Sequence, residues 1–133
     1  MQSETPNALK VLIVEDAIRM QVALTDLVCA VADADIVGVV TSESAALAWA
    51  ESHTGHWDLA IVDLTLDDGD GFHIVQRLKE DPQCGAVVVF SAFVTEVIRR
   101  HCRSLGADAV FHKTESRKLA AYVEELAGSP QAS

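Results

Sequence analysis

Short apolar segments alternate five times with amphipathic segments along the chain. The apolar segments are rich in Val, Ile and Leu, which is typical of strands buried on both faces of a parallel sheet. We expect these strands over residues 8–14, 35–40, 57–63, 86–90 and 108–112. The other segments carry apolar residues at helical spacing, and we expect helices over residues 17–32, 42–54, 71–80, 94–105 and 114–127.

Local signals define the ends and faces of some helices. Thr41 or Ser42 is expected to cap the second helix, and Thr114 the last one. In the first helix, apolar residues recur at roughly helical spacing. They are Ile18, Val22, Leu24, Leu27, Val28 and Val31.

The alternation of strand and helix predicts an α/β fold. We expect a doubly wound, five-stranded parallel sheet with helices on both faces and right-handed crossover connections. A chain of 133 residues is most simply one domain. We place that domain at residues 9–127, with flexible tails over 1–8 and 128–133.

Composition excludes several classes of protein. No apolar run approaches the roughly 18–20 residues that span a bilayer, and the first residues lack the pattern of a secretory signal. The net charge of −10 argues against direct nucleic-acid binding. Cys29, Cys84 and Cys102 are scattered, without a C-x-x-C pair, so we expect reduced cysteines in a cytoplasmic protein and no zinc site.

The positive charges are unevenly distributed. Six of the ten Lys and Arg residues lie between positions 99 and 118. The members of this group are Arg99, Arg100, Arg103, Lys113, Arg117 and Lys118. These residues either lie on solvated helix faces or form a surface that contacts a partner. Lys113 is not part of that surface in the second interpretation.

Chemistry-bearing residues stand at the carboxyl ends of four predicted strands, the edge at which open α/β sheets bind ligands. The set is Glu15, Asp16, Asp63, Ser91 and Lys113. Three carboxylates brought together repel one another unless a cation joins them, and a hard divalent ion with oxygen ligands meets that need. We therefore expect a site for Mg²⁺, or for Mn²⁺ in its place.

Asp63 is the lead residue because it ends the central apolar strand. With a metal bound, its carboxylate is expected to act as a nucleophile toward a phosphoryl donor. The metal and Lys113 would neutralise charge on the transferring phosphoryl oxygens, and Ser91 would donate a hydrogen bond to one of them. The backbone carbonyl of Thr65 is a candidate for a further metal ligand.

These residues resemble the receiver domain of two-component response regulators, the CheY-like family. The matching positions are the acidic pair Glu15-Asp16, the acceptor Asp63, Ser91 followed by the small Ala92, and Lys113. Asp70-Gly71 matches the family's usual start of the third helix, and residues 105–109 match its approach to the fifth strand. The resemblance implies a flavodoxin-like fold with strand order 2-1-3-4-5.

The resemblance also implies a role. A histidine kinase or a histidine phosphotransfer protein would phosphorylate Asp63, and Ser91 would turn toward the phosphate. The fourth helix, fifth strand and fifth helix would then present a changed surface to a downstream protein or to a second copy of the domain. Such a protein is a switch that modifies only itself, not an enzyme acting on other substrates.

Three positions depart from the family pattern. Thr114 follows Lys113 where the family usually has Pro, and Asp67 adds negative charge near the acceptor. Val110 stands where the family usually has its switch aromatic, and Phe111 should point to the opposite face of the strand. A receiver-like interaction module that works without phosphate therefore stays open as the alternative.

Two rivals from other classes fit the residues less well. A phosphatase of the haloacid-dehalogenase type needs a second Asp two residues after the acceptor, and that position is Thr65. A flavodoxin binds phosphate after its first strand, where Glu15-Asp16 would repel it.

Overall fold

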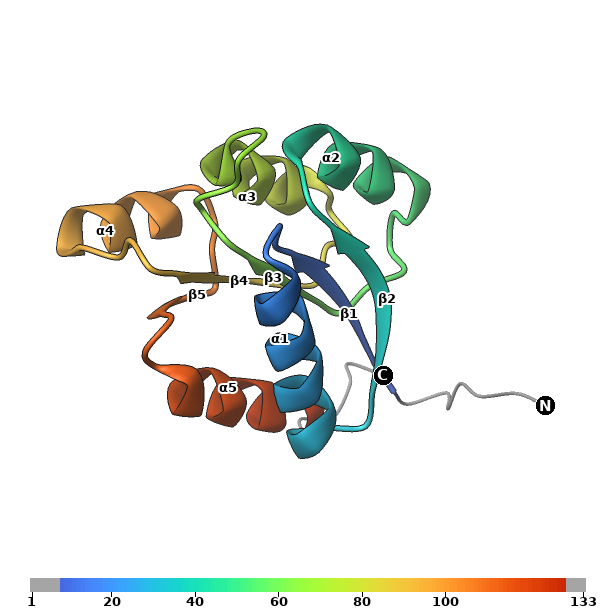
Figure 1. The fold of residues 1–133 in the computed structure, drawn as a ribbon. Coiled ribbons are helices and arrows are strands. Elements are labelled where there is room, and N and C mark those ends of the chain that lie inside the picture. Colours follow the sequence, from blue (N-terminus) through green and yellow to red (C-terminus); the bar gives the residue numbers. More distant parts are fainter. Residues whose placement is uncertain (1–7, 129–133) are drawn as a thin grey trace.

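The five predicted strands form one parallel sheet in the order β2-β1-β3-β4-β5 (Figure 1). The structure is a computed structural model that describes residues 8–128. The strands are β1 (Leu9–Val14), β2 (Ala34–Val40), β3 (Leu59–Val62), β4 (Ala86–Ser91) and β5 (Ala109–His112). The helices are α1 (Ile18–Val31), α2 (Glu43–Ser52), α3 (Gly71–Glu80), α4 (Glu96–Ser104) and α5 (Ser116–Gly128). The predicted fold class and strand order are confirmed.

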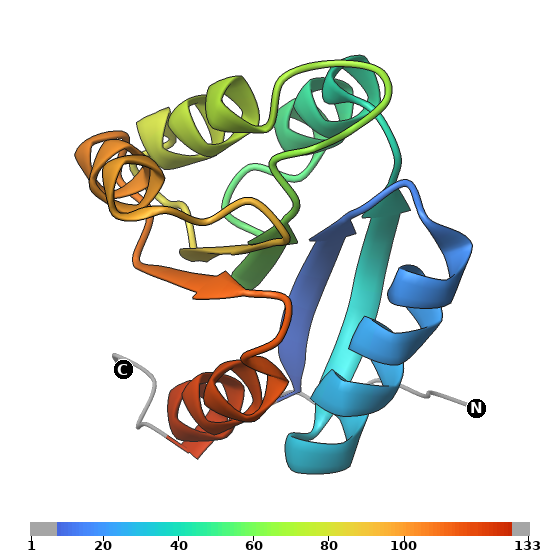
Figure 2. The ribbon, with the colours of Figure 1, turned by 60° about the vertical axis from the view of Figure 1, so that its left-hand side comes forward.

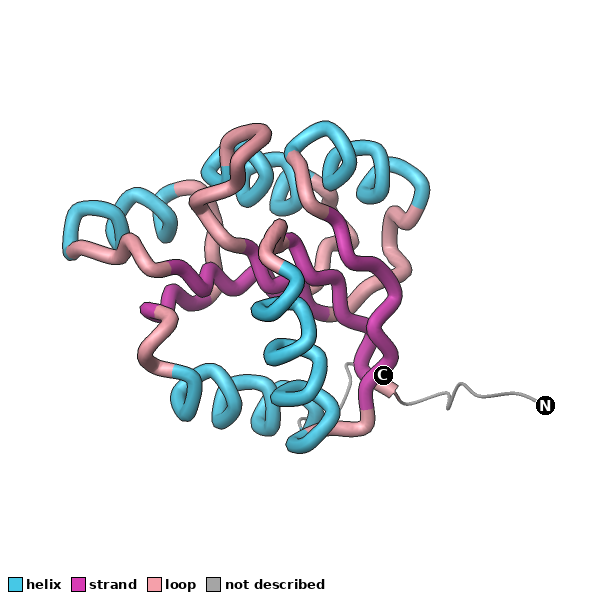
Figure 3. The backbone as a smooth tube through the Cα atoms, in the orientation of Figure 1, coloured by secondary structure: helices cyan, strands magenta, loops and turns pink. Residues whose placement is uncertain are grey.

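Helices cover both faces of the sheet, as Figure 3 shows. Side chains alternate between two cores along each strand. Leu12 and Val110 lie in the core under α2, α3 and α4, whereas Ile13 lies in the core under α1 and α5. Phe111 packs on this second core and meets Tyr122 edge-on, with ring centroids 6.1 Å apart. The predicted opposite orientation of Val110 and Phe111 is therefore confirmed.

Two helices begin two residues later than predicted. The hydroxyl of Thr95 accepts a hydrogen bond from the Ile98 N–H at 3.2 Å, so α4 starts after Thr95. The predicted cap at Thr114 is wrong, because α5 starts at residue 116 and the Thr114 hydroxyl lies 2.8 Å from Nδ1 of His112. For α2, Ser42 is the cap of the two candidates. Short polar side chains compete for the same role, and the backbone path decides between them.

The buried face of α1 is narrower than the set of apolar residues at helical spacing. Leu24 and Val28 are buried, but Ile18 and Val22 are 73% and 55% exposed. Met20 contributes to the core instead. Residues 20, 24, 27, 28 and 31 share one helical face, and positions 18 and 22 lie outside it. The helical spacing of apolar residues therefore includes two positions, 18 and 22, that lie outside the buried face.

The orientation of α1 predicts that substitutions at positions 22 and 24 differ in their effect on stability. Leu24→Ala should lower the free energy of unfolding by about 2–5 kcal/mol, because it leaves a cavity in the core. Val22→Ala should change it by about 0.5 kcal/mol or less, as is usual for exposed positions. Urea denaturation monitored by circular dichroism measures both. Equal losses for the two variants would contradict the observed helix orientation.

The predicted tails fall almost wholly outside the described residues. Two of their members are described: Ala8 is buried against the sheet, and Gly128 is the last residue of α5. Residues 1–7 and 129–133 lie outside the described range. Within residues 8–128, no helix has both the length and the apolar character needed to cross a membrane.

Candidate functional site

The carboxyl ends of β1, β3, β4 and β5 meet at one edge of the sheet (Figure 2). Backbone hydrogen bonds continue one residue past the strands, so the next residues keep the sheet's register. The Asp63 N–H donates to the Val14 carbonyl and the Lys113 N–H to the Ser91 carbonyl, each at 3.0 Å. Parallel pairing of apolar strands thus delivers the polar residues at the strand ends to one place.

Lys113 bridges two buried carboxylates at this edge. Its Nζ atom donates a hydrogen bond to Oδ2 of Asp63 at 3.0 Å and lies 3.1 Å from Oε1 of Glu15. The Asp63 and Glu15 residues are 3% and 1% exposed. The structure therefore brings together three predicted site residues from β1, β3 and β5.

Burial and the neighbouring groups both shift the pKa values of Glu15 and Lys113. Burial raises the pKa of Glu15, and the Asp63 charge adds to that, while the Ala17 N–H and Lys113 oppose it. Burial alone would lower the pKa of Lys113, but its contacts with Asp63 and Glu15 outweigh burial and raise that pKa. Lys113 is thus held as a cation between two acids that have lost most of their water.

Thr65 holds the other carboxylate oxygen of Asp63. Both its N–H and its hydroxyl donate to Oδ1 of Asp63, at 3.2 and 3.1 Å. Sequence reasoning proposed only the Thr65 carbonyl and missed these contacts. A signal existed, since Asp side chains often bond to the backbone two residues further on. With Lys113 on Oδ2, the Asp63 carboxylate is fixed at both oxygens.

Asp16 is partly exposed and points to the β3–α3 loop. Its Oδ2 atom accepts a hydrogen bond from the Asp67 N–H at 2.7 Å. This contact was also missed, because it joins residues 51 positions apart. Asp67 therefore contacts the acidic pair through its backbone, in addition to the charge that the sequence suggested.

Ser91 and the residues after it form the end of β4. Ser91 is fully buried, and its hydroxyl accepts a hydrogen bond from the Phe93 N–H at 3.3 Å. Ala92 is exposed. Val110 is 1% exposed, and its carbonyl accepts a hydrogen bond from the Arg99 guanidinium of α4. The Val110 side chain is therefore an ordinary core contact, while its backbone ties β5 to α4.

A comparison with protein families decides which family this is. The family model described as the response regulator receiver domain matches residues 11–124. The chain belongs to the response regulator receiver domain family. The match runs from β1 into α5, so it includes every element that contributes to the sheet edge.

A curated relative is similar over most of this chain. The response regulator protein VraR of Staphylococcus aureus (strain NCTC 8325 / PS 47) is 27% identical over 110 residues, 83% of this chain and 52% of VraR. This receiver domain therefore spans about half the length of the curated relatives it matches.

The structural matches establish the fold. A chain of the CheX–CheY–BeF3–Mg²⁺ complex from Borrelia burgdorferi aligns with a TM-score of 0.80 at 22% identity, covering 89% of this chain and 88% of that one. The response regulator domain of Thermotoga maritima CheB gives a TM-score of 0.78 at 16% identity, covering 92% and 98%.

The donor set of the receiver domain fits a hard divalent cation. Glu15, Asp16 and Asp63 offer only oxygens, which Mg²⁺ prefers. Oε1 of Glu15 is buried and accepts no hydrogen bond, although Nζ of Lys113 lies 3.1 Å from it. Within the described part of the chain, however, no three His, Cys, Asp or Glu side chains already surround one point. Lys113 supplies the counter-charge in this arrangement.

The basic residues of the predicted partner surface are partly engaged within the chain. Arg99 donates to the Val110 carbonyl, Arg100 pairs with Glu96 at 3.7 Å, and Lys118 pairs with Glu115 at 3.0 Å. Arg103 and Arg117 are exposed. The surface is therefore less basic than the count of Lys and Arg suggested.

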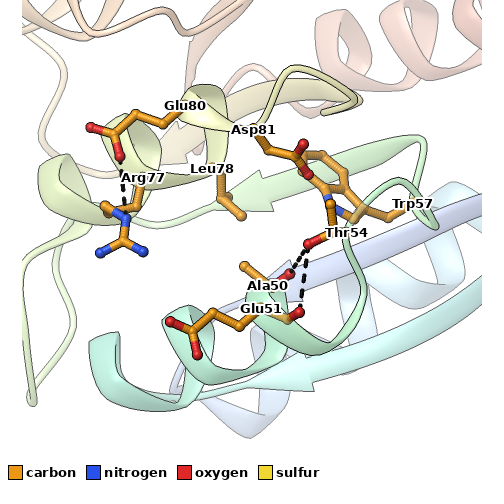
Figure 4. A pocket seen from close by; sticks show the side chains of 8 residues that line it. All are labelled: Ala50, Glu51, Thr54, Trp57, Arg77, Leu78, Glu80 and Asp81. Carbon is orange, nitrogen blue, oxygen red and sulfur yellow. Dashed lines mark hydrogen bonds and ion pairs between the residues drawn. The ribbon is translucent and has the colours of Figure 1, made fainter.

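A pocket of about 270 Å³ lies between the C-terminal halves of α2 and α3 (Figure 4). Trp57, Leu78 and Asp81 are among the residues that line it. Arg77 and Glu80, also in the lining, pair at 3.3 Å. Since α3 begins at the sheet edge where Asp63 lies and ends at this pocket, the pocket is separate from the predicted site. None of the predicted site residues lines it.

Proposed function

We propose that this receiver domain accepts a phosphoryl group on Asp63 from a histidine kinase or a histidine phosphotransfer protein. The observation that carries the proposal is the placement of Lys113 within 3.0 Å of Asp63 and 3.1 Å of Glu15 at the carboxyl edge of the sheet. A carboxylate nucleophile, a fixed cation and an acidic pair are the parts that phosphoryl transfer to an aspartate requires.

The transfer is a displacement at the phosphorus atom. A carboxylate oxygen of Asp63 forms a bond to phosphorus as the bond from phosphorus to the donor's imidazole nitrogen breaks. The imidazole leaves with the electron pair. Lys113 stays close to the oxygens that carry the negative charge, and the Thr65 hydroxyl and N–H orient the attacking carboxylate.

Glu15, Asp16, Asp63 and the Thr65 carbonyl are the groups that would hold Mg²⁺ or Mn²⁺. Bound there, the ion would supply positive charge to the phosphoryl oxygens. The proposal draws support from a similar solved structure, the CheX–CheY–BeF3–Mg²⁺ complex. Glu15 would have to exchange its ion pair with Lys113 for the metal, so Lys113 would be released toward the phosphoryl group.

The phosphorylated state would change the surface of α4, β5 and α5. A phosphate adds negative charge and strong acceptors, which favour a Ser91 hydroxyl that turns toward Asp63. That hydroxyl gives up only a 3.3 Å contact with the Phe93 N–H. Val110 is smaller than an aromatic ring, so its own movement would be limited, and Ala92 leaves room beside Ser91. The chain thus acts as a phospho-accepting switch and not as an enzyme on other substrates.

An acidic downstream protein or a second copy of the domain would contact Arg103 and Arg117. Arg100 and Lys118 would join this contact by giving up their salt bridges within the chain. Arg99 serves a structural role there through the Val110 carbonyl. The net charge of −10 favours protein partners over nucleic acid and membrane surfaces. We place this activity in the cytoplasm, where unpaired Cys29, Cys84 and Cys102 stay reduced.

Intact mass spectrometry after incubation with acetyl phosphate and Mg²⁺ tests the proposal. The wild-type protein should gain about 80 Da, the mass of one phosphoryl group, and lose it again over time. Asp63→Asn should gain nothing. Asp68→Asn, at an exposed loop position, is the matched control and should behave as the wild type. The gain should also disappear when EDTA removes the metal.

A donor protein completes this test. If neither acetyl phosphate nor a panel of purified histidine kinases and phosphotransfer proteins modifies the wild type, and Mg²⁺ does not bind, the proposal is wrong. The receiver-like module that works without phosphate would then be the better description.

A further inference from the structure

The β3–α3 loop, residues 63–70, is attached to the rest of the fold by two carboxylates from other elements. It passes beside the start of α2 (Figure 2). Asp16 accepts from the Asp67 N–H, as described above. The second carboxylate is Glu43, the first residue of α2, which sequence reasoning did not single out. The loop itself carries Asp67, Asp68 and Asp70, so mutual repulsion would otherwise spread it.

Glu43 holds the far side of this loop through three contacts. Its N–H donates to the Asp68 carbonyl at 3.0 Å, and its Oε1 accepts from the Asp70 N–H at 2.9 Å. Its Oε2 pairs with Nδ1 of His73 in the first turn of α3. The hydrogen bond from the Asp70 N–H and, to a smaller extent, the one with His73 keep the pKa of Glu43 below its usual range. The carboxylate is therefore charged and engaged at both oxygens at neutral pH.

The fit between Glu43 and the loop is close. Gly69 has a φ of +118°, and a Cβ atom added there would lie 2.3 Å from Cβ of Glu43 and 2.8 Å from its N. Only glycine allows this backbone conformation together with this approach. The loop is thus fitted to the start of α2 over several residues and is not joined to it by a single bond.

These contacts connect Glu43 to the predicted metal ligands through the loop backbone. Asp67 lies between the residues that Glu43 holds and Thr65, whose carbonyl is a candidate ligand. The Asp67 N–H in turn fixes one oxygen of Asp16 at 2.7 Å. Hydrogen bonds that orient a ligand commonly contribute tenfold to a hundredfold to metal affinity.

We propose that Glu43 is a positioning residue that holds the β3–α3 loop and thereby orients Asp16 and the Thr65 carbonyl toward a bound divalent cation. This inference rests on the proposed function, because it gives Asp16 and Thr65 the role of ligands. Glu43 acts through backbone N–H groups and does not touch the cation.

Two variants separate geometry from charge. Glu43→Ala removes the acceptor of the Asp70 N–H and the partner of His73. It should raise the dissociation constant for Mg²⁺ about threefold to tenfold in isothermal titration calorimetry. Glu43→Gln removes the same charge but keeps an amide oxygen that can accept from Asp70, so it should retain most of the affinity. Glu51→Ala, on the same helix but away from the loop, should match the wild type.

Amide hydrogen exchange measured by NMR without metal gives an independent readout. Exchange at Asp67 and Asp70 should accelerate at least about tenfold in Glu43→Ala, and far less in Glu43→Gln, because the loop opens locally when Glu43 no longer holds it. Exchange in β1 and β3 should stay unchanged, which shows that the fold is intact.

The outcomes distinguish this inference from the proposed function. If the wild type binds Mg²⁺ and Glu43→Ala binds it equally well, the positioning role is wrong and the proposed function stands. If Glu43→Gln loses as much affinity as Glu43→Ala, charge and not position is responsible, and the inference fails again. If the wild type binds no Mg²⁺, the proposed function fails first, and the positioning of ligands fails with it.

Discussion

Replacing Lys113 by methionine should lower the free energy of unfolding by about 2–4 kcal/mol at pH 7.5. The substitution leaves Glu15 and Asp63 buried next to each other without the cation that lies 3.0–3.1 Å from both. Unpaired buried charge is costly, because the lost water is no longer offset by an ion pair. Urea denaturation monitored by circular dichroism measures the loss.

The difference in the free energy of unfolding between Lys113→Met and the wild type should shrink as the pH falls. Burial raises the folded-state pKa of Glu15 above its unfolded value, so the stability that its protonation contributes is complete below the unfolded pKa, about 4.3. That stability is lost as the pH rises through the folded pKa. Lys113 is one of the groups that lower this pKa. Without Lys113, the folded pKa of Glu15 rises further, and the variant should lose stability over a wider range above pH 4.3 than the wild type does.

Two controls test the cause of the Lys113 effect. Lys118→Met removes an exposed lysine whose salt bridge with Glu115 should contribute little to stability, as is usual for surface ion pairs. The double variant Glu15→Gln/Lys113→Met should recover part of the loss, since a neutral amide replaces the unpaired carboxylate. If Lys113→Met were as stable as Lys118→Met at pH 7.5, the positive charge of Lys113 would not offset the buried carboxylates of Glu15 and Asp63.

Gly71→Ala is expected to affect stability and the acceptor together. A Cβ atom at Gly71 would lie 2.5 Å from Cα of Leu64 and 2.7 Å from the carbonyl oxygen of Asp63. Both are backbone atoms, so α3 and the end of β3 would have to move apart. We expect a loss of about 2–3 kcal/mol in the free energy of unfolding. Phosphorylation by acetyl phosphate should slow about tenfold or more, because the reacting carboxylate would be misplaced.

Gly128→Ala is the matched control for Gly71→Ala. Nothing lies within 4 Å of the position that its Cβ would occupy, and Gly128 ends α5. Alanine there should leave stability unchanged or raise it by up to about 1 kcal/mol, because alanine favours the helix. Urea denaturation and the mass-spectrometric rate of phosphorylation compare the pair. A Gly71→Ala variant as stable as the wild type would show that α3 does not approach the acceptor as closely as described.

Much of the fold follows from short-range patterns. The runs of Val, Ile and Leu located all five strands, and α3 begins and ends where its apolar spacing and the Asp81-Pro82 pair predict. Helix starts were less predictable. Thr95 and Thr114 are both reasonable caps, yet only Thr95 caps a helix, because the turn after β5 places the Thr114 hydroxyl beside His112.

The amphipathic pattern of α1 shows a related limit. Ile18 and Val22 are apolar and have helical spacing, but they lie outside the face that packs on β1 and β2. Periodicity identifies a helix, whereas the rotation of its face depends on the sheet to which it packs. Two of the six apolar residues at helical spacing are exposed, so the spacing alone does not define the buried face.

Residue order alone predicted the alternation of strands and helices, helices on both faces of the sheet, and acidic, hydroxyl and lysine groups at the strand ends. Those features depend on residues close together in the chain. The partner that each of these groups contacts is visible only in the folded structure. Lys113 meets Asp63 across 50 positions, and Glu43 meets Asp70 across 27. Such pairs form only once the strands are in register and the helices have packed, so no local pattern encodes them.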